Sequence, residues 1–375
     1  MTPEQQEVVD LKQSGLSISQ IASKLGITHE SAKSRWKRAQ KWIDADPQIA
    51  KTAKEFGVSD VAQMDHYWRR YPTEDGGFVT GHFKNAVANG GGQDILERIS
   101  DAFSSIPAYS PGRAKDTNKD LATVYPLYDM HAGMMAWGRE TRSQDYDLQI
   151  MKRELVSSIE TVSQMSPPSE HGIVIFGGDT IHVNDQKNET PGSGHKMDAD
   201  GRFEKIVDVT IEAVTNAIEL LSQKHEKVSV YVIRGNHDEE SHLILKAALK
   251  QRYRSSDHIE FPKLDAWDKS EIYWFRHGKS LVVMHHGDKC KPERLAMIAA
   301  DKCPYWSETD HRVILTGHLH HLKVQDFPGV THYTLRAFCP PDAYGAMFGG
   351  VRGIQAMTFS ADKGLVLQAH DPIKE

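Results

Sequence analysis

The stretch GIVIFGGD at residues 172–179 carries the pattern that decides the fold of most of the chain. It is an apolar, β-branched run that ends in glycines and a carboxylate, as expected of a buried strand. Similar runs that also end in polar residues lie on both sides of it: TVYPLYDM (123–130), VSVYVIRGN (228–236), SLVVMHHGD (280–288) and RVILTGHLHH (312–321). Residues 272–277, 331–338 and 354–360 predict further strands.

Helical periodicity separates these runs. The segment RFEKIVDVTIEAVTNAIELLSQKH (202–225) places apolar residues at helical spacing. Short strands that alternate with amphipathic helices indicate a layered α/β domain, which we place at residues 121–375. It follows SSIPAYSPGRAKDTNKD (104–120), whose Pro, Gly, Ser and charged residues offer no apolar face and therefore predict a linker.

Composition limits the class of protein. A length of 375 residues predicts two or three domains, and 39% hydrophobic with 26% charged residues is typical of a folded protein. Three cysteines in no CxxC pair argue against a disulfide framework, and no segment approaches an apolar signal-peptide core or a membrane span of about 18 residues. We therefore expect a cytoplasmic protein without a membrane partner. The net charge of −6 argues against a uniformly basic surface for nucleic acid, but leaves room for a local basic patch.

The ends of the five runs carry potential metal ligands. Functional residues of open α/β sheets gather at the carboxyl ends of strands, and neighbouring glycines let the backbone approach a ligand closely. Mixed imidazole and carboxylate donors suit Mn, Fe or Zn better than Mg or Ca. The five ends are Asp129-Met-His131, Gly177-Gly178-Asp179, Gly235-Asn236-His237-Asp238, His285-His286-Gly287-Asp288 and Gly317-His318-Leu319-His320.

The ordered set D-x-H, GGD, GNHD, HG and GHLH resembles the calcineurin-like metallophosphoesterase superfamily over about residues 121–370. The resemblance implies a four-layer α/β/β/α sandwich with two divalent transition metal ions per chain. Mn²⁺ is the expected ion, with Fe, Zn or Ni as alternatives. The resemblance also implies the ligands: Asp129, His131 and His320 for one metal, Asn236, His286 and His318 for the other, and Asp179 as the bridge.

Such a pair of metals suits phosphoester hydrolysis. Ions about 3.5–4 Å apart clamp the attacking and leaving oxygens of an in-line displacement, and the water that they share becomes the attacking hydroxide. His237 is then placed to protonate the leaving alkoxide or to stabilise its charge, and we expect Asp238 to orient that ring.

The choice between His285 and His286 follows from the family pattern, which puts the ligand directly before glycine and favours His286. Strand alternation sends the two side chains to opposite faces, so only one should bind metal. His285 is then a candidate for substrate contact.

Further candidates for substrate contact follow the second strand. His182 or Asn184 is expected to contact phosphate, with a turn cap as the alternative. The polar stretch 185–202 has no strand or helix pattern and falls where an active-site loop would lie. It offers His195 and Arg202, with a plain solvated loop as the alternative.

Residues 1–45 predict a helix-turn-helix module. A first helix begins near Thr2-Pro3 and runs to Gly15, a second is ISQIASKLG (18–26) capped by Ser17 or Ser19, and a third is HESAKSRWKRAQKWI (29–43) capped by Thr28. This arrangement resembles sigma-factor-like DNA readers.

The third helix is basic and is expected to contact DNA phosphates. A solvated charged helix or a protein-docking module is the alternative. The residues concerned are Lys33, Arg35, Lys37, Arg38 and Lys41.

Residues 46–103 are expected to hold a second, degenerate or winged module. Its helices would be KTAKEFGVS (51–59) and VAQMDHYWRRY (61–71), and its wing DGGFVTGHFK (75–84), with Arg69, Arg70 and Lys84.

Together these patterns predict a two-metal phosphodiesterase that hydrolyses nucleic acid, as a DNA nuclease with an amino-terminal DNA-binding module. The combination resembles helix-turn-helix metallophosphoesterases of bacteriophage and prophage genomes and members of the DNA-repair exonuclease type, which implies a bacterial or phage-infected host. The alternative is a phosphoesterase for cyclic nucleotides, nucleotides or phosphomonoesters, whose amino-terminal module docks a partner or DNA. A DNA-binding regulator with an inactive enzyme domain is a third class, which the intact ligand set argues against. Oligomeric state is not readable from the sequence.

Overall fold

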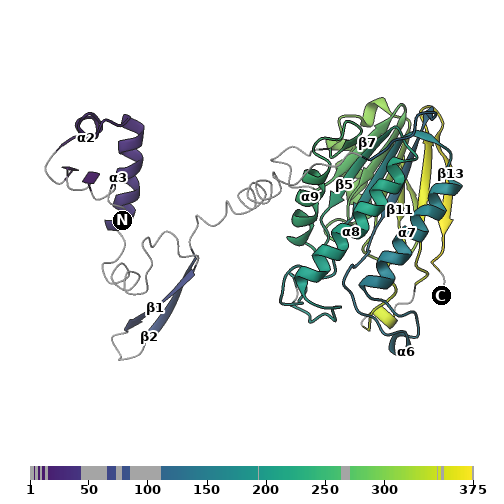
Figure 1. Cartoon of the computed structure of the whole chain (residues 1–375), viewed down its shortest axis with the longest axis horizontal. Coiled ribbons are helices and arrows are strands. Elements are labelled where there is room, and N and C mark those ends of the chain that lie inside the picture. Colours follow the sequence, from purple (N-terminus) through teal and green to yellow (C-terminus); the bar gives the residue numbers. More distant parts are fainter. Residues whose placement is uncertain are drawn as a thin grey trace. The chain divides into compact units, whose positions relative to one another are not determined.

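The computed structural model describes residues 4, 7–8, 11–12, 16–43, 66–72 and 78–84, and residues 111–373 except 193, 263–270, 344 and 348–349. For residues 38–43, 66–72 and 78–84 it describes the backbone alone. The chain divides into two compact units, Met1–Ile95 and Leu96–Glu375 (Figure 1). Within the described part, no helix has the length and apolar character needed to span a membrane.

A six-stranded sheet forms one half of the larger unit. Its strands lie in the order β13-β12-β3-β4-β5-β6, with β3 to β6 parallel and β12 antiparallel to both of its neighbours. The strands are β3 (Asn118–Leu127), β4 (Ser169–Gly177), β5 (Lys227–Ile233), β6 (Ile259–Glu260), β12 (Ile354–Ser360) and β13 (Gly364–Asp371).

A five-stranded sheet forms the other half, in the order β10-β11-β9-β8-β7. Its central pairs β8–β9 and β9–β11 are parallel, and antiparallel hairpins close both edges. The strands are β7 (Tyr273–His277), β8 (Ser280–Met284), β9 (His311–Thr316), β10 (Lys323–Phe327) and β11 (Val330–Thr334).

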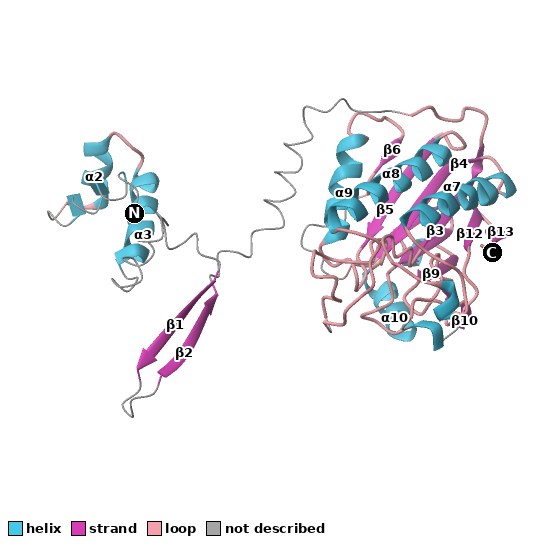
Figure 2. Ribbon diagram, turned by 60° about the horizontal axis from the view of Figure 1, so that its bottom comes forward, coloured by secondary structure: helices cyan, strands magenta, loops and turns pink. Residues whose placement is uncertain are grey.

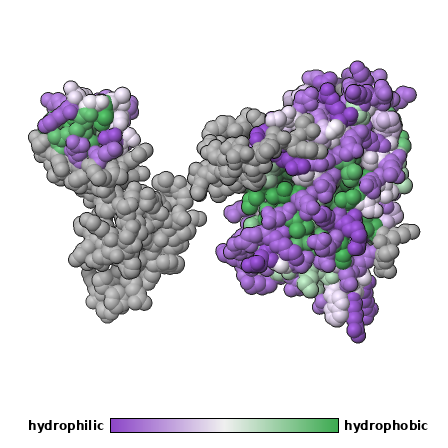
Figure 3. Space-filling view, in the orientation of Figure 1, coloured by the Kyte–Doolittle hydropathy of each residue, from purple (hydrophilic) through white to green (hydrophobic). Residues whose placement is uncertain are grey.

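Helices cover the outer faces of both sheets. Figures 1 and 2 show α7 (Leu148–Met165) and α8 (Phe203–Ser222) across the six-stranded sheet. The Asp147 carboxylate caps α7 by accepting from the Ile150 amide (2.8 Å). The remaining helices of this unit are α6 (Gly138–Thr141), α9 (Ser241–Arg252), α10 (Pro292–Lys302) and the 3-10 turns η3 (Trp306–Glu308) and η4 (Gly345–Met347). Figure 3 shows many hydrophilic residues on the face that carries α7 and α8, as expected of amphipathic helices on a core.

Strand alternation explains why both faces of the six-stranded sheet are covered. On β4, Val174 and Phe176 pack in the core beneath α7 and α8, while Ile173 and Ile175 pack between the two sheets. The opposite side of the five-stranded sheet packs against α10, where Leu295 joins a third cluster. The predicted four-layer α/β/β/α sandwich is thus confirmed.

The predicted strands and the predicted helix over 202–225 are confirmed. The five central strands, however, end before the last residues of the apolar runs that predicted them. The structure ends β3 at Leu127, β4 at Gly177, β5 at Ile233, β8 at Met284 and β9 at Thr316. The polar residues that follow make no strand pairing and lie in loops at one edge of the sheets. Strands β6, β10 and β13 were not predicted.

In the smaller unit, helices α2 (Ile18–Leu25) and α3 (His29–Ile43) confirm the second and third predicted helices. Ser17 and Gln20 form a reciprocal capping box at the start of α2, which ends at Gly26 in the left-handed conformation (φ 63°). The Thr28 hydroxyl accepts from the Ser31 amide (3.2 Å) and so caps α3 as predicted. The first predicted helix lies largely outside the described residues.

The predicted helix over 61–71 is wrong from His66 onward. Strand β1 (His66–Pro72) pairs there with β2 (Phe78–Lys84) in an antiparallel hairpin, so Arg69 and Arg70 lie on one strand and Lys84 on the other. The aromatic residues of HYWRRYP favour a strand, and pairing with β2 satisfies its backbone. Residues 46–65, which include the other predicted helix of this module, lie outside the described part.

Candidate metal centre

The expected metal ligands lie in loops directly after the central strands. Asp129, Asp179, His286 and His318 each come two residues after the end of their strand, and Asn236 comes three residues after β5. Both sheets therefore deliver polar side chains to a common edge, because their parallel strands end on the same side.

Backbone conformation marks the same loops. Five of the expected ligands have a left-handed backbone, which is uncommon and costs of order 1–3 kcal/mol for residues other than glycine. They are Asp129 (φ 51°), His131 (45°), Asp179 (49°), His318 (69°) and His320 (55°). Strain of this kind persists only where the surroundings hold it, and it points to a functional site.

Two glycines allow these loops to approach each other. A Cβ atom on Gly235 would lie 2.0 Å from Oδ1 of Asp179, and one on Gly317 would lie 2.3 Å from Oδ2 of Asp129. Any side chain at these positions would collide with a buried carboxylate, so the motif glycines are needed for packing of the loops.

The first donor group contains Asp129, His131 and His320. Asp129 is fully buried, and its Oδ2 accepts from the His318 amide (2.9 Å). His320 Nε2 lies 3.5 Å from Asp129 Oδ1 and 3.3 Å from His131 Nε2. The three side chains thus converge on one small volume.

The second donor group contains Asp179, Asn236, His286 and His318. His286 Nε2 lies 3.2 Å from both Asp179 Oδ2 and Asn236 Oδ1, while its Nδ1 donates to the Gly177 carbonyl (3.0 Å). Ligand atoms of Asp179, His286 and His318 lie within 4.8 Å of one another. Asp179 Oδ2 is also 3.9 Å from His131 Nε2, so this carboxylate lies between the two groups.

The pKa values of Asp179 and His286 are shifted by burial and by the interaction of the two side chains with each other. Burial by itself would raise the pKa of Asp179, but the adjacent His286 holds that pKa well below its usual value. Burial by itself would lower the pKa of His286, whereas the Asp179 charge raises it. Metal binding replaces protons on such ligands. Buried carboxylates among imidazoles therefore fit divalent metal ions, which would supply the charge that the protonated His286 otherwise provides.

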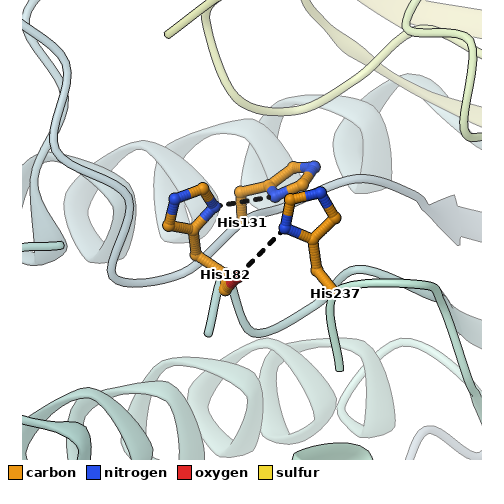
Figure 4. A group of neighbouring side chains, drawn as sticks. All are labelled: His131, His182 and His237. Atoms are coloured by element: carbon orange, nitrogen blue, oxygen red, sulfur yellow. Dashed lines mark hydrogen bonds between the residues drawn. The ribbon is translucent and has the colours of Figure 1, made fainter. Parts of the chain in front are cut away.

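His131, His182 and His237 form a group of neighbouring rings (Figure 4). His131 Nδ1 and His182 Nδ1 are 3.1 Å apart, and burial lowers the pKa of His182 to about 3. We assign the shared proton to His131 Nδ1, because its Nε2 is the atom that faces Asp179 and His320. His182 therefore contacts the side of the His131 ring that faces away from Asp179, and the phosphate contact expected of this buried ring stays a prediction.

His237 is held from two sides. Its amide donates to Asp179 Oδ1 (2.7 Å), and its Nδ1 donates to the His182 carbonyl (3.1 Å) (Figure 4). The second bond leaves Nε2 as the nitrogen available for proton transfer. The ring centroid lies 4.7 Å from that of His131, so His237 stands next to the first donor group.

Asp238 does not orient the His237 ring, and that prediction is wrong. Its buried carboxylate accepts instead from the amides of Gly235 (2.7 Å) and Thr180 (2.9 Å), with longer bonds from Asp179 and Ile181. It therefore ties the loop after β5 to the loop after β4. Burial, with the negative charge of Asp179 second, raises the pKa of Asp238.

Asn184 and His285 each make a contact within the protein, and the substrate contacts expected of them stay predictions. Asn184 Oδ1 accepts from the amides of Glu240 (2.6 Å) and Ser241 (3.3 Å), so it caps α9, the alternative that the sequence left open. His285 is buried and its Nδ1 accepts from the Gly287 amide (2.9 Å). Of the two neighbouring histidines, His286 is the one that joins a donor group.

Four of the remaining candidates, His195, Arg202, Lys33 and Lys37, lie at exposed positions. His195 belongs to a turn closed by a bridge between Glu189 and Lys196, and Arg202 precedes the first residue of α8. On α3, Lys33 and Lys37 are exposed, and Arg35 is half-buried and pairs with Glu4 (3.2 Å). The side chains of Arg38 and Lys41 lie outside the described part.

Two features of the site were not predicted from the sequence. The buried guanidinium of Arg234 bonds to Asp288 (2.9 Å), Glu271 (2.5 Å) and Glu239 (2.8 Å), and so links the loops after β5 and β8. Its position directly before the GNHD motif was the available signal. The second feature is a donor group of His131, His320 and Cys339, which no local motif indicates.

Comparison with known proteins gives one family. A model described as calcineurin-like phosphoesterase matches residues 129–331. No curated protein matches the chain.

Several solved structures are similar. An archaeal phosphodiesterase is 12% identical (67% of this chain and 99% of that chain, TM-score 0.35), and the phosphoesterase Yfce from E. coli is 13% identical (66% and 98%, TM-score 0.32). Zinc-complexed Vps29 from Entamoeba histolytica is 11% identical (66% and 98%, TM-score 0.28). These TM-scores are low, so the family rests on the family model alone.

Proposed function

Since the chain belongs to the calcineurin-like phosphoesterase family, we propose that this metal-dependent phosphoesterase is a phosphodiesterase of nucleic acid, a DNA nuclease. The observation that carries the proposal is the basic helix α3, which follows a capped helix and a glycine turn in the same chain as the metal centre. We further propose that this unit binds the DNA that the metal centre cleaves.

The two donor groups would hold two ions, with Mn²⁺ as the proposed metal. Asp129, His131 and His320 would hold one, Asn236, His286 and His318 the other, and Asp179 both. When bound, such ions supply Lewis acidity, which polarises the phosphoryl oxygens and acidifies water at the site.

The chain itself supplies orientation and a proton. His237 keeps Nδ1–H on the His182 carbonyl, so its ring has one orientation when substrate arrives. In the imidazolium form it can then donate the Nε2 proton to the leaving oxygen as the P–O bond breaks, and it returns to the neutral form. The bond from its amide to Asp179 couples the position of this acid to that of the proposed bridging ligand.

The amino-terminal unit would contribute affinity through phosphate contacts. Lys33 and Lys37 are exposed four residues apart on α3, hence on one side of the helix. Arg35 is engaged by Glu4, so we expect less from it. Contacts of this kind are independent of sequence and depend strongly on salt.

A small-molecule phosphoesterase remains the second candidate, favoured by the net charge of −6. The two candidates separate in one assay of the full chain with Mn²⁺ on single-stranded DNA, duplex DNA, a cyclic nucleotide and a chromogenic phosphodiester. We expect DNA to be cleaved, and cleavage to fall more steeply with salt than hydrolysis of the chromogenic ester. If DNA stays uncleaved while the small esters are hydrolysed rapidly, the nuclease proposal is wrong and the small-molecule phosphoesterase takes its place.

A further inference from the structure

Cys339 lies at the metal centre although it comes from a different part of the chain. It follows β11 and is 3% exposed. Its Sγ and one ring nitrogen each of His131 and His320 lie within 4.8 Å of one another. Its thiol thus faces two of the expected ligands of one ion.

The backbone around Cys339 is held on two sides. The Cys339 amide donates to the Asp129 carbonyl (3.2 Å), and the Phe338 amide donates to the Tyr128 carbonyl (3.2 Å). From the other side, Arg352 Nε donates to the Phe338 carbonyl (2.8 Å). The loop therefore runs alongside the loop that carries Asp129 and His131, and this pairing sets the position of the sulfur.

We propose that Cys339 is a ligand of the ion held by Asp129, His131 and His320. Two donors of one ion can lie no farther apart than the sum of their bond lengths, about 4.4 Å for nitrogen at ~2.1 Å and sulfur at ~2.3 Å. The spacing of this group needs at most a small closure to meet that limit. A thiol that binds a metal loses its proton, so sulfur enters as a thiolate.

The other two cysteines show what a structural thiol looks like in this chain. Cys303 is buried against α10 in an apolar cluster, and Cys290 is half-buried with its thiol directed at the Lys291 carbonyl (3.6 Å). Neither belongs to a donor group of the described residues. Cys339 also borders an apolar cluster, but its sulfur has imidazole nitrogens beside it.

A thiolate would change which metal this position prefers. Thiolate is a soft ligand that selects Zn²⁺ or iron, whereas Mn²⁺ prefers harder oxygen donors. The two positions would then differ, one holding a softer ion beside Cys339 and the other an ion bound by nitrogen and oxygen only. The inference does not depend on whether the substrate is DNA.

Cobalt substitution of the full-length protein tests the proposal. With Co²⁺ loaded to two ions per chain, the wild type should show a sulfur-to-cobalt charge-transfer band in the near ultraviolet. Cys339→Ser should lose this band at unchanged cobalt content, whereas Cys290→Ala and Cys303→Ala should keep it. A fully loaded wild type without the band, or a band that persists in Cys339→Ser, overturns the proposal.

A second measurement needs no variant and stands if Cys339→Ser fails to fold. X-ray absorption of the zinc-loaded wild type should show one sulfur per chain at about 2.3 Å from zinc. Zinc surrounded by nitrogen and oxygen alone refutes the thiolate ligand and leaves the nuclease proposal standing. Failure to cleave DNA, conversely, refutes the nuclease proposal and leaves this one standing.

Discussion

The side chains of Asp129 and Asp179 are 0% and 2% exposed, whereas the side chain of Lys33 on α3 is 51% exposed. The first pair belongs to a cluster in which carboxylate and imidazole groups lie within hydrogen-bonding distance of one another. The lysine stands on a helix whose backbone is capped locally and whose charge faces solvent. The candidate metal centre and helix α3 therefore differ in how their charged side chains are surrounded.

Because their surroundings differ, the two regions should respond differently to amino-acid substitution. In the buried cluster the donors share partners, so the loss of one disturbs the others, and effects should be large and far from additive. On helix α3 the exposed Lys33 and Lys37 are surrounded mainly by water, so the effects of replacing them should be small and should add.

The largest effect is expected at Asp179, which lies between the two donor groups. Asp179→Asn replaces a charge shared by His286 and His131 with a neutral amide, so we expect no measurable turnover and reduced metal content. Hydrolysis of a chromogenic phosphodiester and elemental analysis measure both. The control is Asp208→Asn, at an exposed position on α8. An Asp179→Asn protein that keeps two ions and full turnover would show that the cluster is not cooperative.

Substitution of His237 should reduce turnover less than substitution of Asp179, because we propose that His237 donates a proton and does not bind metal. General acid catalysis contributes about 10²–10⁴-fold, so His237→Ala should lose that much in kcat with metal content retained. The loss should shrink on esters with a good leaving group such as p-nitrophenolate, which needs no proton. Equal losses on good and poor leaving groups would argue against a proton donor.

His182 should have a smaller effect again, since it acts through His131. Loss of a partner that orients a metal ligand typically costs about 10–100-fold in metal affinity. We expect His182→Ala to weaken binding of the ion that His131 would hold by that factor in a chelator competition. His370→Ala, at an exposed position on β13, is the matched control and should leave the affinity unchanged. Unaltered affinity in His182→Ala would indicate that backbone alone holds His131.

The smallest and most additive effect is expected on α3. Each duplex phosphate contact that is lost should lower the slope of log affinity against log salt by about 0.9. Lys33→Ala and Lys37→Ala should each lower the slope by this amount, and the double variant should lower it by the sum of the two decreases. DNA binding at several salt concentrations measures the slopes, with Lys363→Ala in the larger unit as control. Slopes equal to the wild type in the double variant would remove α3 from the DNA interface.

Much of this architecture could be predicted because it depends on patterns among residues that are close together in the sequence. Alternation along IVIF (173–176) predicts a strand with two covered faces, and the same signal recurs at each central strand. Capping is equally local, since Ser17 and Gln20 meet across one turn of helix. The hairpin strand at residues 66–72 was mistaken for a helix because its partner lies outside the segment, and only pairing satisfies its backbone.

Local patterns thus suffice to predict the layered class of fold, the order of the strand-end motifs and the type of donor that each supplies. Contacts between distant segments establish which donors meet, that Asp238 ties two loops, that Asn184 caps a helix and that His182 contacts His131. They also bring Cys339 beside His131 from the far end of the chain. The physical reason is that a side chain's role depends on its partners in space, and for buried polar groups those partners come from whichever strands the sheets place side by side.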